Sequence, residues 1–191
     1  MLYTGKGDNG MTSLYGCDQR LSKSSAIAEA LGTVDEINSF LGLVKATAKR
    51  DGYSLAGKTF HDIAHEIQHD LFIVQAELAG ADKRMDEAHV TKLEKWIAVA
   101  EGELPPIKTF FVPGQTELGA LFDVARTVAR RAERRVIGAL ELHAGEEGTP
   151  VLGEEEKPPL LAYLNRLSSV LYALARLSVH KSGLKEEAPH Y

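Results

Sequence analysis

The sequence predicts an all-α protein, an up-and-down bundle of five helices that follows an extended N-terminal loop. Apolar residues recur at helical spacing over five stretches, polar and glycine-rich segments separate these stretches, and strand-like runs are scarce. The 191 residues suit a single domain with a sizeable core. We divide it into a loop over residues 1–22, a helical bundle over 25–183 and a polar tail over 184–191 that we expect to fray.

The first two helices are predicted from regular apolar stripes. One stripe covers 25–49, and Gly52 and Gly57 mark the break after it. The second stripe covers 59–81. Both stripes place an apolar residue every three or four positions, as expected for helices that bury one face.

Three histidines, His61, His65 and His69, recur every four residues in the second helix. Such spacing could suggest zinc, but the glutamate placement of a metalloprotease helix is missing. The histidines lie away from the apolar stripe. We therefore favour a solvated or interface face over a metal site.

A third, shorter helix is predicted over 86–103, before a pair of prolines. A connector then leads to a fourth helix over 116–143, for which Thr116 is a candidate N-cap. Strand-like residues occur only at Leu2–Thr4 and within the connector at Lys108–Val112.

The last helix is predicted to begin at Pro158-Pro159 after an acidic segment, 145–156, that reads as a solvated loop. Its leucines alternate at spacings of four and three, which is the narrow seam of bundle packing.

The overall charge argues against several classes of partner. The net charge is −5 and the pI is near 5.8, so we expect neither nucleic acid nor a membrane surface as a partner. A single cysteine, Cys17, provides no disulfide framework and no cysteine-based zinc site. No signal-peptide core and no run of 18 apolar residues occurs, so we expect a cytoplasmic location.

Five arginines are concentrated within residues 126–135 of this acidic chain. At 100° per residue, Arg126, Arg130, Glu133 and Arg134 share one arc of the fourth helix. Guanidinium groups bind phosphate or carboxylate through paired N–H donors. The run indicates a specific anionic ligand, and the alternative is a solvated face with salt bridges.

The N-terminal segment 4–13 is a second candidate for anion binding. Its three glycines let backbone N–H groups converge, Lys6 adds a charge, and Asp8, Thr12 and Ser13 could orient a hydrated metal. It is not a Walker A loop, because Gly-Lys-Ser/Thr is absent. A flexible polar N-terminus is the alternative. Combined with the arginine run, the segment becomes a plausible phosphate-binding loop and second wall of a polyphosphate site.

Two further polar positions flank the apolar stripes. Asp35 lies at the margin of the first stripe, and Asn165 lies near the edge of the leucine seam. Taken alone, each favours a structural role. No Ser-His-Asp or Cys-His arrangement emerges, so the nucleophile of any reaction would come from a substrate or cofactor.

Five motifs, in chain order, resemble those of the PduO-type ATP:cob(I)alamin adenosyltransferases. The resemblance runs from about residue 2 to about residue 181, nearly the whole chain. The motifs are YTGKGDNG at 3–10, GTVDE at 32–36, FFVPG at 110–114, ARTVARRAERR at 125–135 and YLNRLS at 163–168.

The resemblance implies a five-helix bundle that assembles as a homotrimer with active sites between subunits. It implies transfer of the 5′-deoxyadenosyl group of ATP to the cobalt of cob(I)alamin, giving adenosylcobalamin and triphosphate. Cobalt is then the nucleophile, and the protein orients ATP and stabilises the leaving group. ATP, Mg²⁺ and cobalamin are the implied ligands, and a cobalamin reductase and an adenosylcobalamin-dependent acceptor enzyme are the implied partners.

The resemblance also assigns roles to residues. Arg130, Glu133 and Asn165 are the implied catalytic residues, and Phe110 is implied to fill the lower face of the cobalamin. Asp35 and Arg126 are implied to pair across subunits. Most of the Mg²⁺ ligands are expected to be ATP phosphates, with Glu133 as a candidate protein ligand. The implied ATP-binding residues are Thr4, Gly5, Lys6, Gly7, Asp8, Asn9, Gly10, Met11, Thr12, Ser13, Lys23, Arg130, Arg131, Ala132, Glu133, Arg134 and Asn165.

Some positions depart from the family pattern. Gly5-Lys6 replaces Lys-Thr, which retains one lysine. Gln115, Asp123 and Ser169 stand where glycine, histidine and aspartate are usual, and all three are expected near the corrin pocket. These departures motivate one alternative, a module that binds adenosylcobalamin without efficient turnover. An RNA-binding arginine helix has little support, since stacking aromatics and a broad basic surface are missing.

Overall fold

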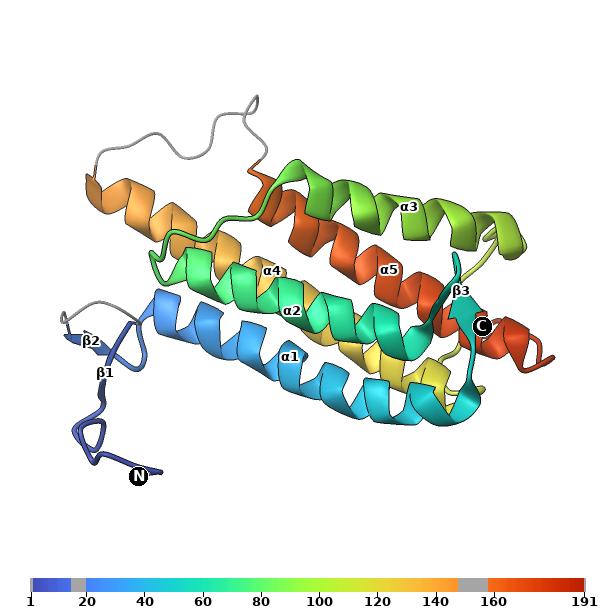
Figure 1. Ribbon diagram of the computed structural model, residues 1–191, viewed down its shortest axis with the longest axis horizontal. Coiled ribbons are helices and arrows are strands. Elements are labelled where there is room, and N and C mark those ends of the chain that lie inside the picture. Colours follow the sequence, from blue (N-terminus) through green and yellow to red (C-terminus); the bar gives the residue numbers. More distant parts are fainter. Residues whose placement is uncertain (1, 15–19, 148–157, 191) are drawn as a thin grey trace.

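The computed structural model describes residues 2–14, 20–147 and 158–190. Figure 1 shows long helices lying side by side, with a short hairpin near the N-terminus projecting from one end. None of the helices in these ranges combines the length and apolar content that a membrane crossing requires. The elements are α1 (Ala26–Asp51), α2 (Phe60–Leu78), α3 (Glu87–Glu103), α4 (Glu117–Glu147), α5 (Pro159–Lys181), β1 (Met11–Ser13), β2 (Arg20–Ser22), β3 (Ser54–Leu55) and β4 (Lys58–Thr59).

Polar caps explain where four of the helices begin. Ser25, Thr59 and Asp86 precede α1, α2 and α3, and each side chain accepts a backbone N–H of the first turn. Thr116, the predicted cap of α4, accepts the N–H of Gly119 at 3.0 Å. Each capping oxygen satisfies one of the backbone donors that a helix end leaves free.

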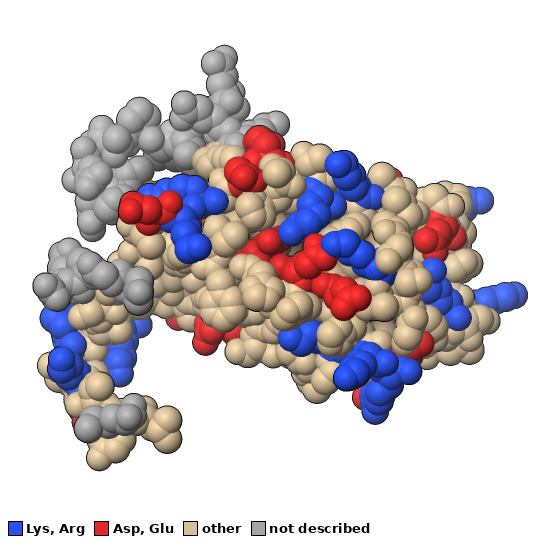
Figure 2. Space-filling view, in the orientation of Figure 1, with Lys and Arg blue, Asp and Glu red and all other residues tan. Residues whose placement is uncertain are grey.

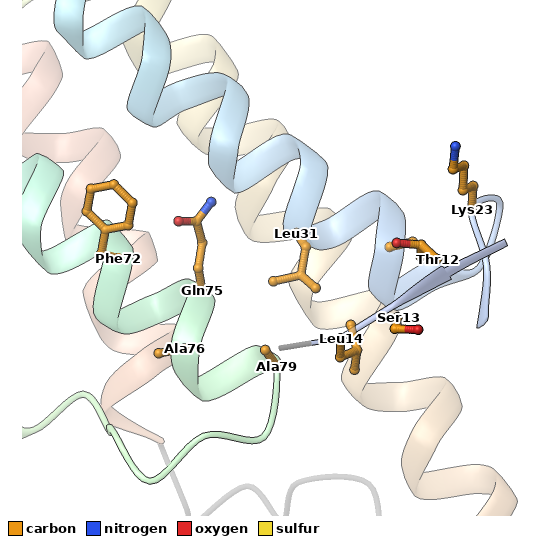
Figure 3. Close-up of a pocket in the computed structure, with 10 residues that line it drawn as sticks. Thr12, Ser13, Leu14, Lys23, Leu31, Phe72, Gln75, Ala76 and Ala79 are labelled. Carbon is orange, nitrogen blue, oxygen red and sulfur yellow. The ribbon is translucent and has the colours of Figure 1, made fainter. Parts of the chain in front are cut away.

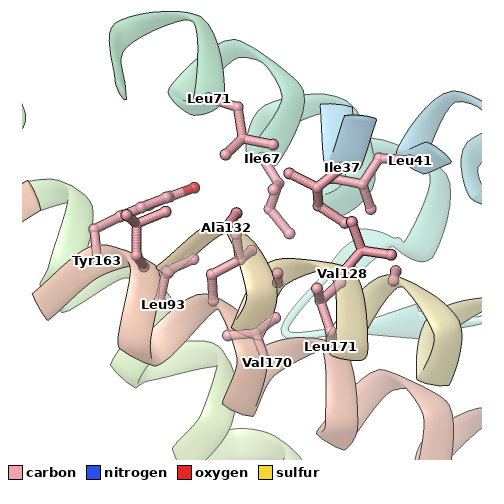
Figure 4. Packing of buried hydrophobic residues seen from close by; sticks show 14 of the residues in the cluster. Ile37, Leu41, Ile67, Leu71, Leu93, Val128, Ala132, Tyr163, Val170 and Leu171 are labelled. Carbon is pink, nitrogen blue, oxygen red and sulfur yellow. The ribbon is translucent and has the colours of Figure 1, made fainter. Parts of the chain in front are cut away.

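The core lies between α4 and its neighbours. α4 packs against α1 and α5, α2 packs against α1, and α3 packs against α5. Figure 4 shows the interdigitating side chains where these helices meet. The buried residues labelled there are Ile37, Leu41, Ile67, Leu71, Leu93, Val128, Ala132, Tyr163, Val170 and Leu171.

Neither of the two strand-like candidates forms a strand. Leu2–Thr4 forms no strand, and within Lys108–Val112 only Val112 pairs, in an isolated bridge to Glu187. The strands that do form, β1 with β2 and β3 with β4, are antiparallel pairs of two or three residues. Such short polar strands carry no alternating apolar pattern for sequence reasoning to detect.

Two boundaries and the tail also differ from expectation. α4 continues to Glu147, so the predicted loop over 145–156 begins inside a helix, and its remainder lies outside the described residues. α2 ends at Leu78, three residues before the predicted end. The tail is not frayed at Glu186 and Glu187, because both residues contact the bundle and its connector.

Candidate functional site

A cavity of about 730 Å³ lies where the connector between α3 and α4 meets the arginine-rich part of α4. Its size is in the range of small-molecule sites in proteins. The cavity is lined by Ile107, Lys108, Thr109, Phe110, Phe111, Pro113, Asp123, Arg126, Arg130, Ser168, Ser169 and Tyr172. The sequence-predicted residues Phe110, Arg126 and Arg130 are thus brought together at one site.

Two of the five arginines have ion-pair partners on α1. Arg131 lies 2.5 Å from Glu36, and Arg135 lies 3.5 Å from Glu29, with all four side chains close to half exposed. The salt-bridged alternative therefore holds for these two positions. Arg131 is also predicted to bind nucleotide, and within one chain its guanidinium is paired with the carboxylate of Glu36.

Arg126 is also paired within the chain. Its Nε donates to Asp123 Oδ1 at 2.7 Å, and its guanidinium carbon lies 5.8 Å from the ring centre of Tyr172. Burial raises the pKa of Tyr172 above its ordinary value, so this hydroxyl stays protonated at neutral pH. Arg126 is fixed at the cavity wall by these two neighbours.

Arg130 and Arg134 differ from the other three arginines. Neither forms an ion pair with any residue in the described part of the chain. Arg134 donates one bond, at 3.0 Å, to the backbone carbonyl of Arg130. Both side chains are exposed one helical turn apart on the same face of α4. With respect to the described residues, these two cations are available for an external anion.

The predicted catalytic pair Glu133 and Asn165 is in direct contact. Asn165 Nδ2 donates to Glu133 Oε1 at 2.9 Å, which joins α4 to α5 beside the available arginines. Asn165 Oδ1 in turn accepts from Arg166 at 2.7 Å, and Arg166 lies 3.0 Å from Glu94 of α3. The hydrogen-bond chain fixes the orientation of the Asn165 amide.

The N-terminal loop is folded on itself. Asp8 N donates to Gly5 O and Gly10 N donates to Gly7 O, both at 3.2 Å, which gives two successive turns. Gly5 and Gly10 have φ of 68° and 78°, a conformation that glycine adopts without strain. Lys23 lies against this loop, because a Cβ at Gly7 would be 2.9 Å from its Nζ. The structure therefore brings Lys23 together with the predicted phosphate-binding segment 4–13.

Arg20 organises this loop, and sequence reasoning missed it. Its Nη2 donates to the carbonyl of Lys6 at 2.5 Å, to the carbonyl of Met11 at 3.2 Å and to Asn9 Oδ1 at 3.3 Å. The only signal in the sequence is an isolated basic residue after a glycine-rich segment. Figure 2 shows basic side chains gathering at this hairpin, whereas acidic and basic side chains are interspersed over the helices on that face.

A second cavity, of about 570 Å³, opens between the hairpin and the adjacent ends of α1 and α2. Figure 3 shows Lys23 and Thr12 at one side and Phe72 and Gln75 at the other. The lining residues are Thr12, Ser13, Leu14, Lys23, Ala28, Leu31, Phe72, Gln75, Ala76 and Ala79. This cavity shares no lining residue with the arginine cavity. The N-terminal hairpin and the pair Arg126 and Arg130 therefore line separate cavities of one chain.

The family model for cobalamin adenosyltransferase matches residues 2–178. The chain belongs to the cobalamin adenosyltransferase family. It is 38% identical over 191 residues to the corrinoid adenosyltransferase of Bacillus subtilis, covering 96% of this chain and 89% of that protein. It is 31% identical over 196 residues to the human corrinoid adenosyltransferase MMAB, covering 97% and 72% of the two chains. Membership confirms the resemblance and makes the chain an enzyme of the corrinoid adenosyltransferase class.

Solved structures of the family share the fold. A variant PduO-type ATP:corrinoid adenosyltransferase from Lactobacillus reuteri, complexed with cobalamin and ATP, superposes with a TM-score of 0.81 at 28% identity, and all of both chains is covered. A second variant of that enzyme, complexed with ATP, has a TM-score of 0.80 and covers 99% of this chain and 100% of that chain. The five helices are therefore those of an adenosyltransferase.

Three of the positions that depart from the family pattern, Gln115, Asp123 and Ser169, lie in or beside the arginine cavity. Asp123 and Ser169 line it, whereas Gln115 lies in the adjoining cavity of about 50 Å³. Asp35, the predicted intersubunit partner of Arg126, is exposed on α1 and accepts only a 3.5 Å bond from Gln75 among the described contacts.

Proposed function

We propose that this protein transfers the 5′-deoxyadenosyl group of ATP to the cobalt of cob(I)alamin, with triphosphate as the leaving group. One observation carries this proposal. Arg130, which lines a cavity of about 730 Å³, and Arg134, one helical turn further along α4, are both exposed without an ion-pair partner among the described residues. Exposed guanidinium groups can bind an anion there, and the family's relatives act on ATP and corrinoids.

The cobalamin substrate supplies the nucleophile, so the protein needs no nucleophilic side chain. Its own residues bind and orient. Arg130 and Arg134 offer paired N–H donors to the triphosphate, and they stabilise the charge that grows on it as the C5′–O bond breaks. The Glu133–Asn165 pair, at 2.9 Å, orients the nucleotide beside them. Phe110, 81% exposed at the cavity rim, covers the lower face of the corrin.

Mg²⁺ enters as part of the ATP substrate. Among the described residues, no three His, Cys, Asp or Glu side chains form a group that could hold a metal ion. A magnesium ion keeps several waters and takes its other ligands from phosphates and one or two carboxylates. We assign that carboxylate to Glu133.

We also propose that the up-and-down bundle functions as a homotrimer. In one chain the loop over residues 4–13 and the arginine face line separate cavities, so one chain alone leaves the nucleotide site incomplete. A second copy would bring its loop to the arginines. Arg126 could then donate to Asp35 of that copy as well as to its own Asp123, since a guanidinium has five donors.

The decisive test follows the cobalamin absorbance spectrum during anaerobic reaction with Mg-ATP. We expect conversion to adenosylcobalamin with ATP and no conversion with an analogue whose C5′ cannot be transferred. Cobalamin binding without turnover would instead support the binding module suggested by Asp123 and Ser169. Light scattering after size exclusion tests the trimer independently.

A further inference from the structure

Arg176 on α5 is a buried cation behind the arginine cavity. Its side chain is 7% exposed, and its Nε and Nη2 donate to the two carboxylate oxygens of Glu186 at 2.6 and 2.8 Å. Nη2 also donates to the carbonyl of Pro105 at 3.0 Å, and the guanidinium carbon lies 5.0 Å from the ring centre of Phe111. This one side chain of α5 therefore contacts the C-terminal tail at Glu186 and the connector between α3 and α4 at Pro105 and Phe111.

The tail is also joined directly to the connector. The N–H of Val112 donates to the carbonyl of Glu187 at 2.8 Å, and Gln115 donates to the carboxylate of Glu187 at 3.2 Å. These bonds follow immediately after Glu186 in the chain. Releasing Glu186 from Arg176 would therefore loosen the tail and the connector together.

Few other contacts within the described part of the chain fix the connector. Residues 107–110 are exposed, and Phe110 itself is 81% exposed, so its ring is positioned by the backbone and not by packing. Six residues between 107 and 113 nevertheless form a large part of the cavity wall. The shape of that wall depends on how the connector is anchored behind it.

We propose that Arg176 is a positioning residue for cobalamin: its fork-like contacts with Glu186 and Pro105 fix the connector that carries Phe110. The inference rests on the proposed function, since it assigns cobalamin to this cavity. A lysine could reach one of these acceptors but could not form the paired bonds to a carboxylate. The hydrogen bond with Glu186 raises the pKa of Arg176 further above its ordinary value, so the guanidinium stays charged.

The test compares Glu186→Gln and Arg176→Lys with the wild-type full-length protein. Glu186→Gln keeps the shape of the side chain and removes its charge. Three quantities are measured: the dissociation constant of cob(II)alamin by absorbance titration, KM for ATP, and the rate at which trypsin cleaves after Lys108 in the connector. Lys92→Met is the matched control, because it removes an ion pair to the buried Asp70, at 2.7 Å, that touches neither tail nor connector.

We expect Glu186→Gln to weaken cob(II)alamin binding by about tenfold, the effect of losing one charge-assisted hydrogen bond. KM for ATP should stay unchanged and cleavage after Lys108 should accelerate. Arg176→Lys should show the same pattern more weakly. Lys92→Met should lower the melting temperature without altering cobalamin binding or cleavage, which separates positioning from general destabilisation.

Three results would overturn the inference. Both variants could bind cob(II)alamin as the wild type does, with an unchanged rate of cleavage. Alternatively, KM for ATP could rise together with the cobalamin dissociation constant, which would indicate general damage. A wild-type protein that binds no cob(II)alamin would refute the proposed function and the inference with it, whereas the first two results leave the proposed function standing.

Discussion

Replacing Arg130 by alanine is the sharpest test of the arginine helix. Arg130 is exposed beside the cavity and forms no ion pair within the described chain, so its removal orphans no carboxylate. The fold should therefore be almost unaffected, by about 0.5 kcal/mol or less. Loss of one preorganised donor to a developing oxyanion costs about 3–4 kcal/mol, so kcat/KM should fall by about 100- to 1000-fold.

Arg135→Ala provides a matched control on the same helix. Arg135 lies 3.5 Å from Glu29, and both side chains are more than half exposed, so this pair contributes between zero and about 1 kcal/mol to stability. We expect its kcat/KM to remain within about twofold of the wild type. Arg130→Lys keeps the charge without the planar fork and should lie between the two.

The assay is the anaerobic absorbance conversion of cob(I)alamin with Mg-ATP varied, accompanied by thermal melting of each variant. The reasoning is refuted if Arg130→Ala retains wild-type kcat/KM. It is equally refuted if Arg130→Ala and Arg135→Ala lose activity to the same extent, because position on the helix would then be irrelevant.

Three further predictions concern neighbouring features. Asn165→Asp should raise KM for ATP by more than about tenfold, because it places a second carboxylate beside Glu133. This increase in KM should be larger than the increase caused by Asn165→Ala. Tyr163→Phe should cost about 1–3 kcal/mol and lower the melting temperature by several degrees with kcat retained, because the fully buried hydroxyl donates to Asp70 at 3.0 Å. Asp86→Ala should lower the melting temperature more than Asp86→Asn, which keeps a cap for α3. The side-chain hydrogen bond with His89 lowers the pKa of Asp86 in the folded protein. The stability that the Asp86 carboxylate contributes is therefore fully present above pH 3.8, its ordinary pKa, and is lost as the pH falls through the lower pKa of the folded state. Melting below pH 4 should therefore be less acid-sensitive in Asp86→Asn than in the wild type.

The sequence predicted the helices well because their determinants are local. Periodic apolar residues and the capping side chains Ser25, Thr59 and Thr116 set helix positions within each segment. The polar contacts depend on how helices are placed against one another. Arg131 contacts Glu36, whereas Arg130 lines the cavity. This difference follows from how α4 packs on α1, and the periodicity of apolar residues does not specify that packing.

The candidate site was predictable to the extent that it rests on motifs. The motifs named Phe110, Arg130, Glu133 and Asn165, and the structure places the first two at one cavity and the last two in contact. They gave no indication of Arg176, whose partners are 71 residues earlier and ten residues later in the chain. A buried charge with distant partners leaves no periodic trace in a sequence.

The way the N-terminal loop is held has a consequence for inactivation. In the described parts of this loop, residues 2–14 and 20–22, order comes from turns, the short β1–β2 pairing and the guanidinium of Arg20, and none of these residues belongs to the apolar core of the bundle. Segments held by a few exposed hydrogen bonds open with much less free energy than the whole molecule. On heating, nucleotide binding should therefore be lost at temperatures where circular dichroism still reports intact helices. Cooling should restore it, since the helices never unfolded.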